Sequence, residues 1–393
     1  MGIYIDNVRA VFPEERIVST TIRLDDGKVV AIGDPSPHAD DEVVHGKGRL
    51  LTPGLIDMHV HGIMHSRFDG GPDELLAGAE AFARFGTTTV LPTAVPKRGA
   101  TTLNNLEALA GALERVTKVN MPGLHLEGPF MALPGAGCDV VPGDLGLLDE
   151  LLAACRGRVQ VMSLSPDTPN ILPVIERLRE EGIVPFVTHT AATLQQTQAA
   201  IAAGARHATH FYDVFPVPPA TDGGVRPVGT VEAFLANPDA TVDFIADGCH
   251  VDPIAIQLAV RAKSCLSVAI ITDGNVGAGL PAGEYPTPWG YPVRVEPGNG
   301  ARIADPDHPS FGLLAGSALT MNVGMANVLD WLDEPPEMVW AMGTTTPARI
   351  AALPDKGSLA VGADADVVLW NDDLNAARTW VKGEQVYNDP EEC

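Results

Sequence analysis

Residues 55–61 read LIDMHVH, a short apolar run with histidine at positions 59 and 61, near its end. Runs of similar length and character recur along the chain, and stretches with helical spacing of apolar residues separate them. These runs predict strands at 55–61, 87–92, 123–127, 159–164, 184–189, 207–211, 242–247 and 268–273. Helices are predicted at 75–85, 103–116, 171–181 and 194–203. Strands that alternate with helices in this way are typical of a parallel sheet in an α/β protein.

Eight such repeats favour closure of the sheet into a (β/α)8 TIM barrel over residues 53–353. A doubly wound open sheet is the alternative. Residues 1–52 and 354–393 differ from the repeats, because both contain short apolar runs around turns, such as Asp25-Asp26-Gly27 and Asp364-Ala365-Asp366. We therefore expect a small β domain built from both chain termini.

The balance of charges argues against several classes of partner. The chain has 26 basic and 50 acidic residues, a formal net charge of -24, which disfavours binding to nucleic acid or to an anionic membrane. Residues 1–15 carry acids early and contain no long apolar run, so we expect a cytoplasmic protein without a signal peptide. The five cysteines are an odd number without a CxxC pair, so neither a disulfide framework nor a zinc knuckle is indicated.

Side chains that can bind a metal occur at the ends of the predicted strands, where barrel enzymes place their active sites. In residues 55–61, the two-residue period of a strand puts His59 and His61 on one face with Asp57, while Met58 and Val60 face the helices. Two imidazoles at this spacing can bind one ion. The candidate ligands are His59, His61, Glu127, His189, His210 and Asp273.

Each of these residues also has a structural interpretation. A single strand histidine is more often a hydrogen-bonded core residue than a ligand, and we assign His125 and His207 to that class. Glu127 alone could form a salt bridge, and Asp273 alone could cap a helix. Four histidines and two carboxylates at successive strand ends are harder to place in a core, because unpaired carboxylates are costly inside a barrel. The set therefore predicts a metal centre.

Nine motifs, in this order, give the chain a resemblance to the N-acetylglucosamine-6-phosphate deacetylases of the amidohydrolase superfamily. Of these, HLEGP, ADGxHV, TDG and LAGSALTM are together specific to this branch, whereas His-x-His alone is a weak signal. The motifs are PGLIDMHVHG (53–62), GTTTVLPT (86–93), GLHLEGPF (123–130), THTAAT (188–193), HATHFYD (207–213), ADGCHVDP (246–253), ITDG (271–274), LAGSALTM (314–321) and KGSLAVGADADVVLW (356–370).

The resemblance implies the chemistry and a role for each candidate ligand. Glu127, His189 and His210 would bind one ion, and His59 and His61 a second, with Glu127 bridging. One or two divalent ions are expected, zinc first, with iron or manganese as alternatives. Asp273 would take the proton of the attacking water and pass it to the leaving amine. The resemblance also suggests a homodimer, with residues 211–228 as the segment in which to look for a subunit contact.

Several positions that would recognise the substrate depart from the family pattern. The loop at 135–139 reads GAGCD, so it offers Cys138 and Asp139 where the family usually has a histidine. After His210 the chain reads FYD, which places an acid where the family has an asparagine that helps to hold the sugar phosphate. The arginine of the phosphate-binding stretch is shifted by one position. The residues expected to contact a small-molecule substrate are His250, Asp213, Tyr212, Arg226, Cys138 and Asp139.

The expected activity is therefore deacetylation of an N-acetylated amino sugar or its 6-phosphate, and the departures favour the unphosphorylated compound. A related amidohydrolase acting on a different unphosphorylated N-acyl amine is the alternative. A cyclic-amide hydrolase would typically carry a lysine on the fourth strand, and residues 159–164 contain none. A non-catalytic scaffold is disfavoured, because all six expected metal positions are filled.

Overall fold

A parallel sheet of eight strands forms the centre of the molecule, and each strand pairs with the next along the chain. The computed structural model describes residues 2–135, 137–298 and 300–390. The strands are β6 (Leu55–Val60), β9 (Thr87–Ala94), β10 (Leu124–Glu127), β11 (Val159–Leu164), β12 (Val184–Val187), β13 (His207–Ala208), β14 (Thr241–Ile245) and β15 (Val268–Ile271). All eight predicted strands are present in the predicted order.

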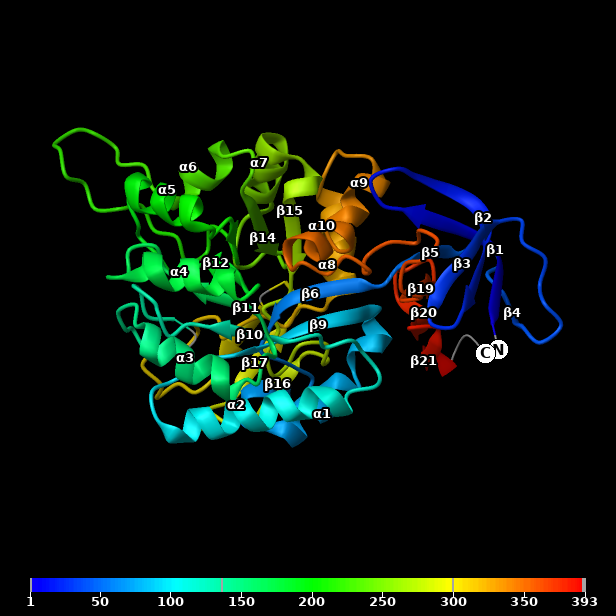
Figure 1. Ribbon diagram of the computed structural model, residues 1–393, viewed down its shortest axis with the longest axis horizontal. Helices are drawn as coiled ribbons and strands as arrows, with labels where there is room; N and C mark the ends of the chain where they lie inside the picture. Colours follow the sequence, from blue (N-terminus) through cyan, green and yellow to red (C-terminus); the bar gives the residue numbers. More distant parts are fainter. Residues whose placement is uncertain (1, 136, 299, 391–393) are drawn as a thin grey trace.

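The sheet curls until its first and last strands meet, which confirms the barrel and rules out the open sheet (Figure 1). At the carboxyl ends, Asp273 N donates to His59 O at 2.9 Å and His61 N donates to Gly274 O at 2.8 Å. At the amino ends, the segment 342–343 lies between the two strands and accepts a hydrogen bond from Ile56 N and another from Ile270 N, both at 3.0 Å. The barrel is therefore nearly closed.

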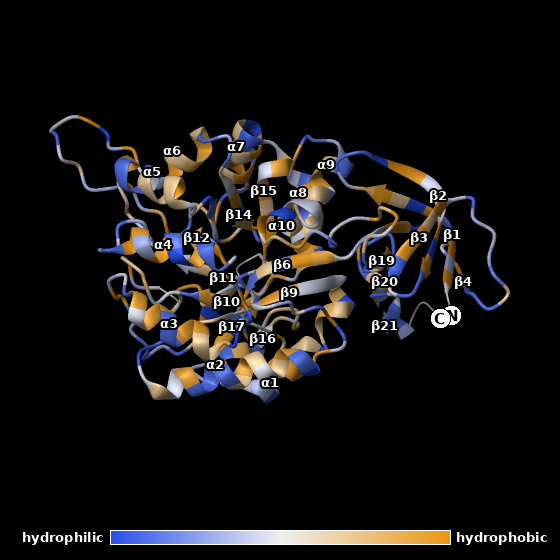
Figure 2. Cartoon of the chain, viewed as in Figure 1, coloured by the Kyte–Doolittle hydropathy of each residue, from blue (hydrophilic) through white to orange (hydrophobic). Residues whose placement is uncertain are grey.

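Helices follow the barrel strands and pack on the outside of the sheet (Figure 1). In Figure 2, α2, α3 and α4 alternate between hydrophobic and hydrophilic colours, as amphipathic helices on a barrel surface should. The helices are α1 (Pro72–Ala79), α2 (Ala100–Ala112), α3 (Leu145–Ala154), α4 (Ile171–Glu180), α5 (Leu194–Ala203), α6 (Thr230–Ala236), α7 (Pro253–Lys263), α8 (Met321–Trp331), α9 (Pro336–Ala341) and α10 (Thr345–Ile350). The predicted helix at 75–85 instead divides into α1 and a separate 3-10 turn, Phe82–Phe85.

The interior of the barrel is filled by apolar side chains, including Met58, Leu91, Val161 and Phe186, which belong to one buried cluster. Met58 was expected to face the helices, and that expectation was wrong. A register shift between Asp57 and Val60 interrupts the pairing of β6 with β9. Such an irregularity adds a residue to one strand and reverses the alternation of side chains beyond it.

A second sheet combines strands from both ends of the described chain, as predicted, and lies at one end of the barrel (Figure 1). Its strands are β1 (Ile3–Phe12), β2 (Arg16–Asp25), β3 (Lys28–Gly33), β4 (Glu42–His45), β5 (Leu50–Pro53), β19 (Val367–Trp370), β20 (Ala376–Val381) and β21 (Glu384–Asn388). β5 pairs with β1 on one side and with β19 on the other. The domain boundaries at 52/53 and 353/354 stay a prediction.

Two small antiparallel elements lie between the metal-binding motifs and were not predicted. One is the hairpin β7 (Gly62–Ile63) and β8 (Ser66–Arg67), directly after His61. The other is the sheet of β16 (Gly283–Tyr285), β17 (Val293–Glu296) and β18 (Gly300–Ile303), between β15 and α8. Their strands are too short to give a clear two-residue period. Within the described ranges, each helix is too short or too polar to traverse a lipid bilayer.

Candidate metal centre

Glu127 lies among four histidines at the carboxyl end of the barrel. Its Oε1 is 3.2 Å from His189 Nε2 and 3.2 Å from His210 Nε2. Its Oε2 is 3.2 Å from His61 Nε2, and His59 Nε2 is 4.0 Å from Oε1. These side chains come from four different strand ends, so the barrel places the predicted ligands around one carboxylate, with its two oxygens turned toward different histidines.

Asp273 completes the group on the side of His59 and His61. Its Oδ1 is 3.3 Å from His59 Nε2 and 3.4 Å from His61 Nε2. The possible ligand atoms form two sets, and the atoms of each set lie within 4.8 Å of one another. His59, Glu127 and His210 form one set, and His59, His61 and Asp273 form the other. All six predicted metal ligands therefore converge.

The donor atoms fit divalent cations. His59 Nε2 and Glu127 Oε2 are buried, and neither has a hydrogen-bond partner of acceptable geometry within the described parts of the chain. Buried polar atoms are normally paired, and an unpaired carboxylate oxygen is costly. Imidazole nitrogens and carboxylate oxygens are the usual ligands of zinc and of related transition metals. A cation between these atoms would supply the missing partner.

The charges around Glu127 and Asp273 favour the ionised carboxylates. Burial opposes ionisation of Glu127, but the charge of His59 and the close approach of His189, His210 and His61 hold its pKa well below the ordinary value. Burial likewise opposes ionisation of Asp273, yet the close approach of His59 and the charges of the nearby histidines lower its pKa to about 2. Both acids are therefore anionic at neutral pH and available to a cation.

Three of the six residues have backbone angles that non-glycine residues rarely adopt. φ is +44° at His189, +36° at His210 and +47° at Asp273. All three follow directly after or close to the last residue of a strand, and this left-handed turn aims the side chain over the mouth of the barrel. Strained backbone of this kind tends to occur at functional sites. It also explains why sequence periodicity alone could not give their directions.

A layer of buried hydrogen bonds below the centre supports two of its histidines. His125 Nε2 is 2.5 Å from Ser163 Oγ, and the His125 and His59 rings lie 4.7 Å apart, centroid to centroid. His207 Nε2 is 2.9 Å from Asp243 Oδ2, and Asp243 Oδ1 accepts from His210 N at 2.6 Å. Both are hydrogen-bonded core histidines, as the sequence indicated, whereas Asp243 was missed.

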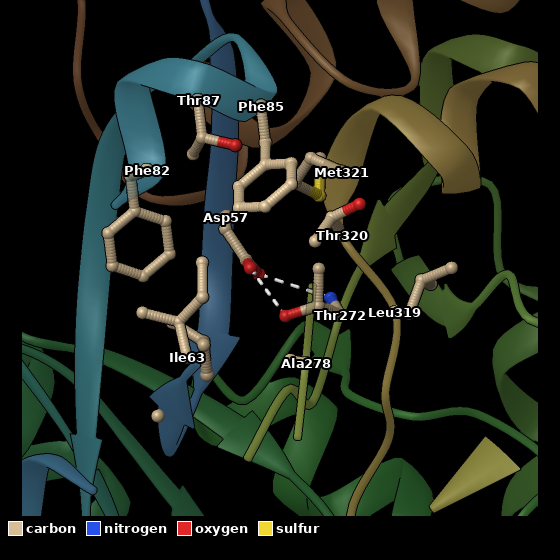
Figure 3. Close-up of a pocket in the computed structure, with 12 residues that line it drawn as sticks. Asp57, Ile63, Phe82, Phe85, Thr87, Thr272, Ala278, Leu319, Thr320 and Met321 are labelled. Carbon is tan, nitrogen blue, oxygen red and sulfur yellow. Dashed lines mark hydrogen bonds between the residues drawn. The ribbon is translucent and has the colours of Figure 1, made fainter. Parts of the chain in front are cut away.

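Asp57 does not face the metal centre, in contrast to the expectation from strand periodicity. Its carboxylate points toward Thr272 in a small space lined by aromatic rings, among them Phe82 and Phe85 (Figure 3). Thr272 Oγ1 donates to Oδ2 at 2.6 Å, and Thr272 N donates to Oδ1 at 3.2 Å. Burial raises the pKa of Asp57 to about 7. Asp57 thus joins β6 to β15 at the seam of the barrel, and the bulge in β6 accounts for its direction.

His250 and Asp213 lie beside the metal centre. The pKa of Asp213 is raised by burial, while the positive charges of His250, His210 and His189 act to lower it. His250 Nδ1 is 2.8 Å from Asp247 Oδ2, so Asp247 orients this ring. Asp247 is part of the ADG motif, but sequence reasoning assigned it no role.

Cys138 and Asp139 lie in the loop after β10 and differ in their surroundings. Cys138 Sγ donates to Glu127 O at 3.2 Å, and burial strongly raises the pKa of its thiol. Its side chain therefore lies against the backbone of a metal ligand. Asp139 Oδ2 accepts from Arg98 N at 2.9 Å, which connects two loops.

Tyr212 packs against an aromatic side chain, and Arg226 forms a surface ion pair. The Tyr212 ring packs 6.2 Å from Phe244, centroid to centroid, next to the hydrophobic cluster between barrel and helices. Arg226 pairs with Glu232 at 3.0 Å, and 69% of its side chain is exposed. A direct substrate contact by either residue in a single chain receives no support from this placement.

Gly135 lies against His189, a predicted metal ligand, which gives a test of the centre by a small steric change. A Cβ built at Gly135 would come within 1.9 Å of His189 Cε1. Gly135→Ala should displace the His189 ring and lower the bound metal by up to one equivalent per chain, as measured by elemental analysis. Gly223→Ala is the control, because a Cβ there meets no atom within 4 Å among the described residues. Full metal content in Gly135→Ala would contradict this placement of His189.

A barrel whose strand ends gather four histidines and two carboxylates has the features of a metal-dependent hydrolase. The chain belongs to the amidohydrolase family, whose model matches residues 50–386. Members of this family are metal-dependent amide hydrolases, and the closeness of the chain to one branch is clear from individual relatives.

Those relatives are deacetylases of amino-sugar phosphates. The N-acetylglucosamine-6-phosphate deacetylase of Vibrio furnissii is 33% identical over 351 residues, which are 86% of this chain and 83% of that protein. The N-acetylgalactosamine-6-phosphate deacetylase of Escherichia coli O157:H7 is 32% identical over 373 residues, 92% of this chain and 93% of that protein. A solved structure of a mutant N-acetyl-D-glucosamine-6-phosphate deacetylase from Mycobacterium smegmatis, in complex with N-acetyl-D-glucosamine-6-phosphate, has a TM-score of 0.83 at 27% identity and covers 99% of both chains.

Proposed function

We propose that this protein removes the acetyl group from an N-acetylated amino sugar by hydrolysis of the amide bond. The observation that carries the proposal is the position of Glu127, with three histidine Nε2 atoms at 3.2 Å and Asp273 alongside. The relatives support the same reaction, since the Vibrio furnissii and Escherichia coli proteins are deacetylases of N-acetylated sugar 6-phosphates. The reaction needs no covalent intermediate on the protein.

The proposed ligands are those on which sequence and geometry agree. Glu127, His189 and His210 would hold one divalent ion and His59 and His61 a second, with Asp273 adjacent; zinc is the first choice, and iron or manganese the alternatives. When bound, such an ion polarises the amide carbonyl and makes water a better nucleophile near neutral pH. The histidines would bind the ions through Nε2, and Thr188 Oγ1 lies 3.3 Å from His210 Nε2.

Asp273 is the proposed proton carrier. Its pKa of about 2 keeps it ionised, and 16% of its side chain is exposed, so water and substrate can reach it. It would accept a proton from the attacking water and deliver that proton to the amide nitrogen as the C–N bond breaks. An amine leaves poorly unless it is protonated, so the return of the proton is as necessary as its removal.

We further propose that the preferred sugar has no 6-phosphate. Asp213 lies beside His250, where the relatives' pattern has a neutral asparagine, and Arg226 is paired with Glu232. A phosphate dianion at about 5 Å from an ionised carboxylate would be repelled by on the order of several kcal/mol before screening, at an effective dielectric constant of about 20. The relatives are named as deacetylases of sugar 6-phosphates, which favours a phosphorylated substrate. Activity on both kinds of sugar therefore has to be measured.

Asp213→Asn should therefore raise kcat/KM for N-acetylglucosamine-6-phosphate by at least about tenfold, because it removes the repelling charge. The wild-type protein should favour unphosphorylated N-acetylhexosamines or other N-acyl amines over this compound and over N-acetylgalactosamine-6-phosphate. The control is Asp239→Asn, which removes an exposed acid from the helix side. A wild-type kcat/KM above about 10⁴ M⁻¹s⁻¹ for either phosphorylated sugar would disprove the preference.

A homodimer in the cytoplasm is the proposed working form. The loop 212–229 between β13 and α6 extends away from the body of the molecule (Figure 1). It exposes Val217, Val225 and Val228, which suits a surface that a second copy covers. Sedimentation of the protein and of a triple Val→Ser variant would show whether this loop holds two copies together.

A further inference from the structure

Two aromatic rings are stacked in the connection between β16 and β17, outside the metal centre. The rings of Trp289 and Tyr291 lie 5.6 Å apart, centroid to centroid, with an angle of 25° between their planes. Thr287 Oγ1 donates to Tyr291 O at 2.5 Å and accepts from Trp289 N at 3.3 Å, so the turn is closed. Gly290, with φ at +88°, allows the tight turn between the two rings.

Polar groups surround this stack. The Arg67 guanidinium lies 4.9 Å from the centroid of the Trp289 ring, and the His308 ring lies 4.4 Å from that of Tyr291. His308 Nδ1 accepts from Ser310 N at 3.1 Å, so the neutral ring carries its proton on Nε2 and can donate from there. The stack therefore combines flat apolar faces with hydrogen-bond donors at its edges.

The stack is placed at the mouth of the barrel by the hairpin β7–β8. Arg67 pairs across this hairpin with Gly62, the residue after His61, and Phe68 N donates to His61 O at 2.8 Å. On its other side, the three-stranded sheet approaches the strand end that carries His250: a Cβ built at Gly300 would lie 3.7 Å from Cys249 Cβ. The sheet thus spans the mouth from the His61 side to the His250 side.

The stack also differs from three of the other tryptophans. Trp340, Trp370 and Trp380 are at most 2% exposed and form part of the hydrophobic cores. Trp289 and Tyr291 are only partly buried, and the Arg67 guanidinium lies over the Trp289 ring. Stacking on a partly exposed indole is most useful for a ligand that has one apolar face and polar edges. A pyranose ring has this shape, because its C–H groups form a flat face and its hydroxyls point outward.

We propose that Trp289 and Tyr291 form a second sugar-binding subsite, which holds a pyranose ring linked to the N-acetylated sugar whose amide lies at the metal centre. The proposal rests on the proposed deacetylase function and names a class of substrate for it: a short oligosaccharide that carries N-acetylated sugars. Trp289 supplies the stacking face and His308 Nε2 donates to a hydroxyl, while Arg67, whose guanidinium pairs with Asp69, lies over the Trp289 ring and holds it in place. These residues bind and position the substrate and take no part in bond cleavage.

The test is equilibrium binding by calorimetry to the metal-loaded Asp273→Asn protein, which we expect to bind without hydrolysing. The two probes are N-acetylglucosamine and its β-1,4-linked dimer. Trp289→Ala should weaken binding of the dimer by about tenfold, in line with the loss of one stacked ring, and leave the monomer within about twofold. Trp289→Phe should restore most of the affinity. Phe311→Ala removes a half-exposed ring from the same region and serves as the control.

An equal loss for monomer and dimer would show that Trp289 only supports the fold of the mouth, and unchanged binding of both would show that the stack is not a subsite. Either result overturns the proposal, and so does failure of the dimer to bind more tightly than the monomer. The proposed function is judged separately, by release of acetate from N-acetylated sugars by the wild-type protein. Acetate release together with equal binding of both probes would refute the subsite alone.

Discussion

Asp273→Asn is expected to lower kcat by about 10² to 10⁴-fold, the usual contribution of a general acid–base group. An asparagine keeps an oxygen that can face His59 and His61, but it cannot carry a proton from water to the leaving amine. KM should stay close to the wild-type value, because the loss falls on the transition state. The measurement is steady-state hydrolysis of the best N-acetylated substrate across pH 6 to 9.

Metal content decides how this result is interpreted. The variant should keep the bound metal of the wild-type protein, so that the loss of rate reports proton transfer and not an empty centre. Activity above about a tenth of wild type would assign the proton to another group, and His250, whose pKa is influenced by the charge of Asp273, is the first candidate.

The double variant Glu127→Ala, His189→Ala should lose the metal between β10 and β12 and all measurable activity. It removes the carboxylate that three Nε2 atoms approach at 3.2 Å together with one of those histidines. Loss of catalysis should exceed that of Asp273→Asn, since no ligand set remains to orient water against the amide. His59→Ala with His61→Ala should instead lower the metal content by about one equivalent.

The matched control for these variants is His45→Ala, because His45 pairs with Asp6 at 2.9 Å and lies exposed on the small sheet, which contains none of the predicted ligands. Its metal content should equal that of the wild-type protein. Full occupancy in the Glu127→Ala, His189→Ala protein, measured by mass spectrometry under native conditions, would show that the ions bind elsewhere.

Much of the fold could be predicted because each barrel strand is a short apolar run that can be recognised in the sequence. Segments such as 159–164 and 268–273 are apolar, short and separated by helical patterns, and only a parallel sheet accommodates eight of them. The ligands could be named because strand ends of a barrel meet at one rim. Glu127 and His210 are 83 positions apart in sequence, yet their side chains lie 3.2 Å from each other.

The remainder depended on local backbone geometry that composition does not reveal. The bulge in β6 turned Asp57 toward Thr272 and Met58 into the barrel, and a two-residue period cannot anticipate an extra residue. Asp243 was missed because its partners, His207 and the backbone N–H of His210, become neighbours only after the strands pair. The short strands β16, β17 and β18 carry too few residues for a periodic pattern.

The pairing of β5 with both β1 and β19 has a consequence for synthesis of the chain on the ribosome. β5 ends at Pro53, whereas its neighbour β19 begins at Val367, and Lys28 reaches its partner Asp364 across 336 positions. Through most of translation the amino-terminal strands exist with one edge uncovered. Such edges invite pairing with other nascent chains, and contacts this distant in sequence form slowly. The strands β19, β20 and β21 leave the ribosome last and therefore complete the sheet that β1 to β5 began.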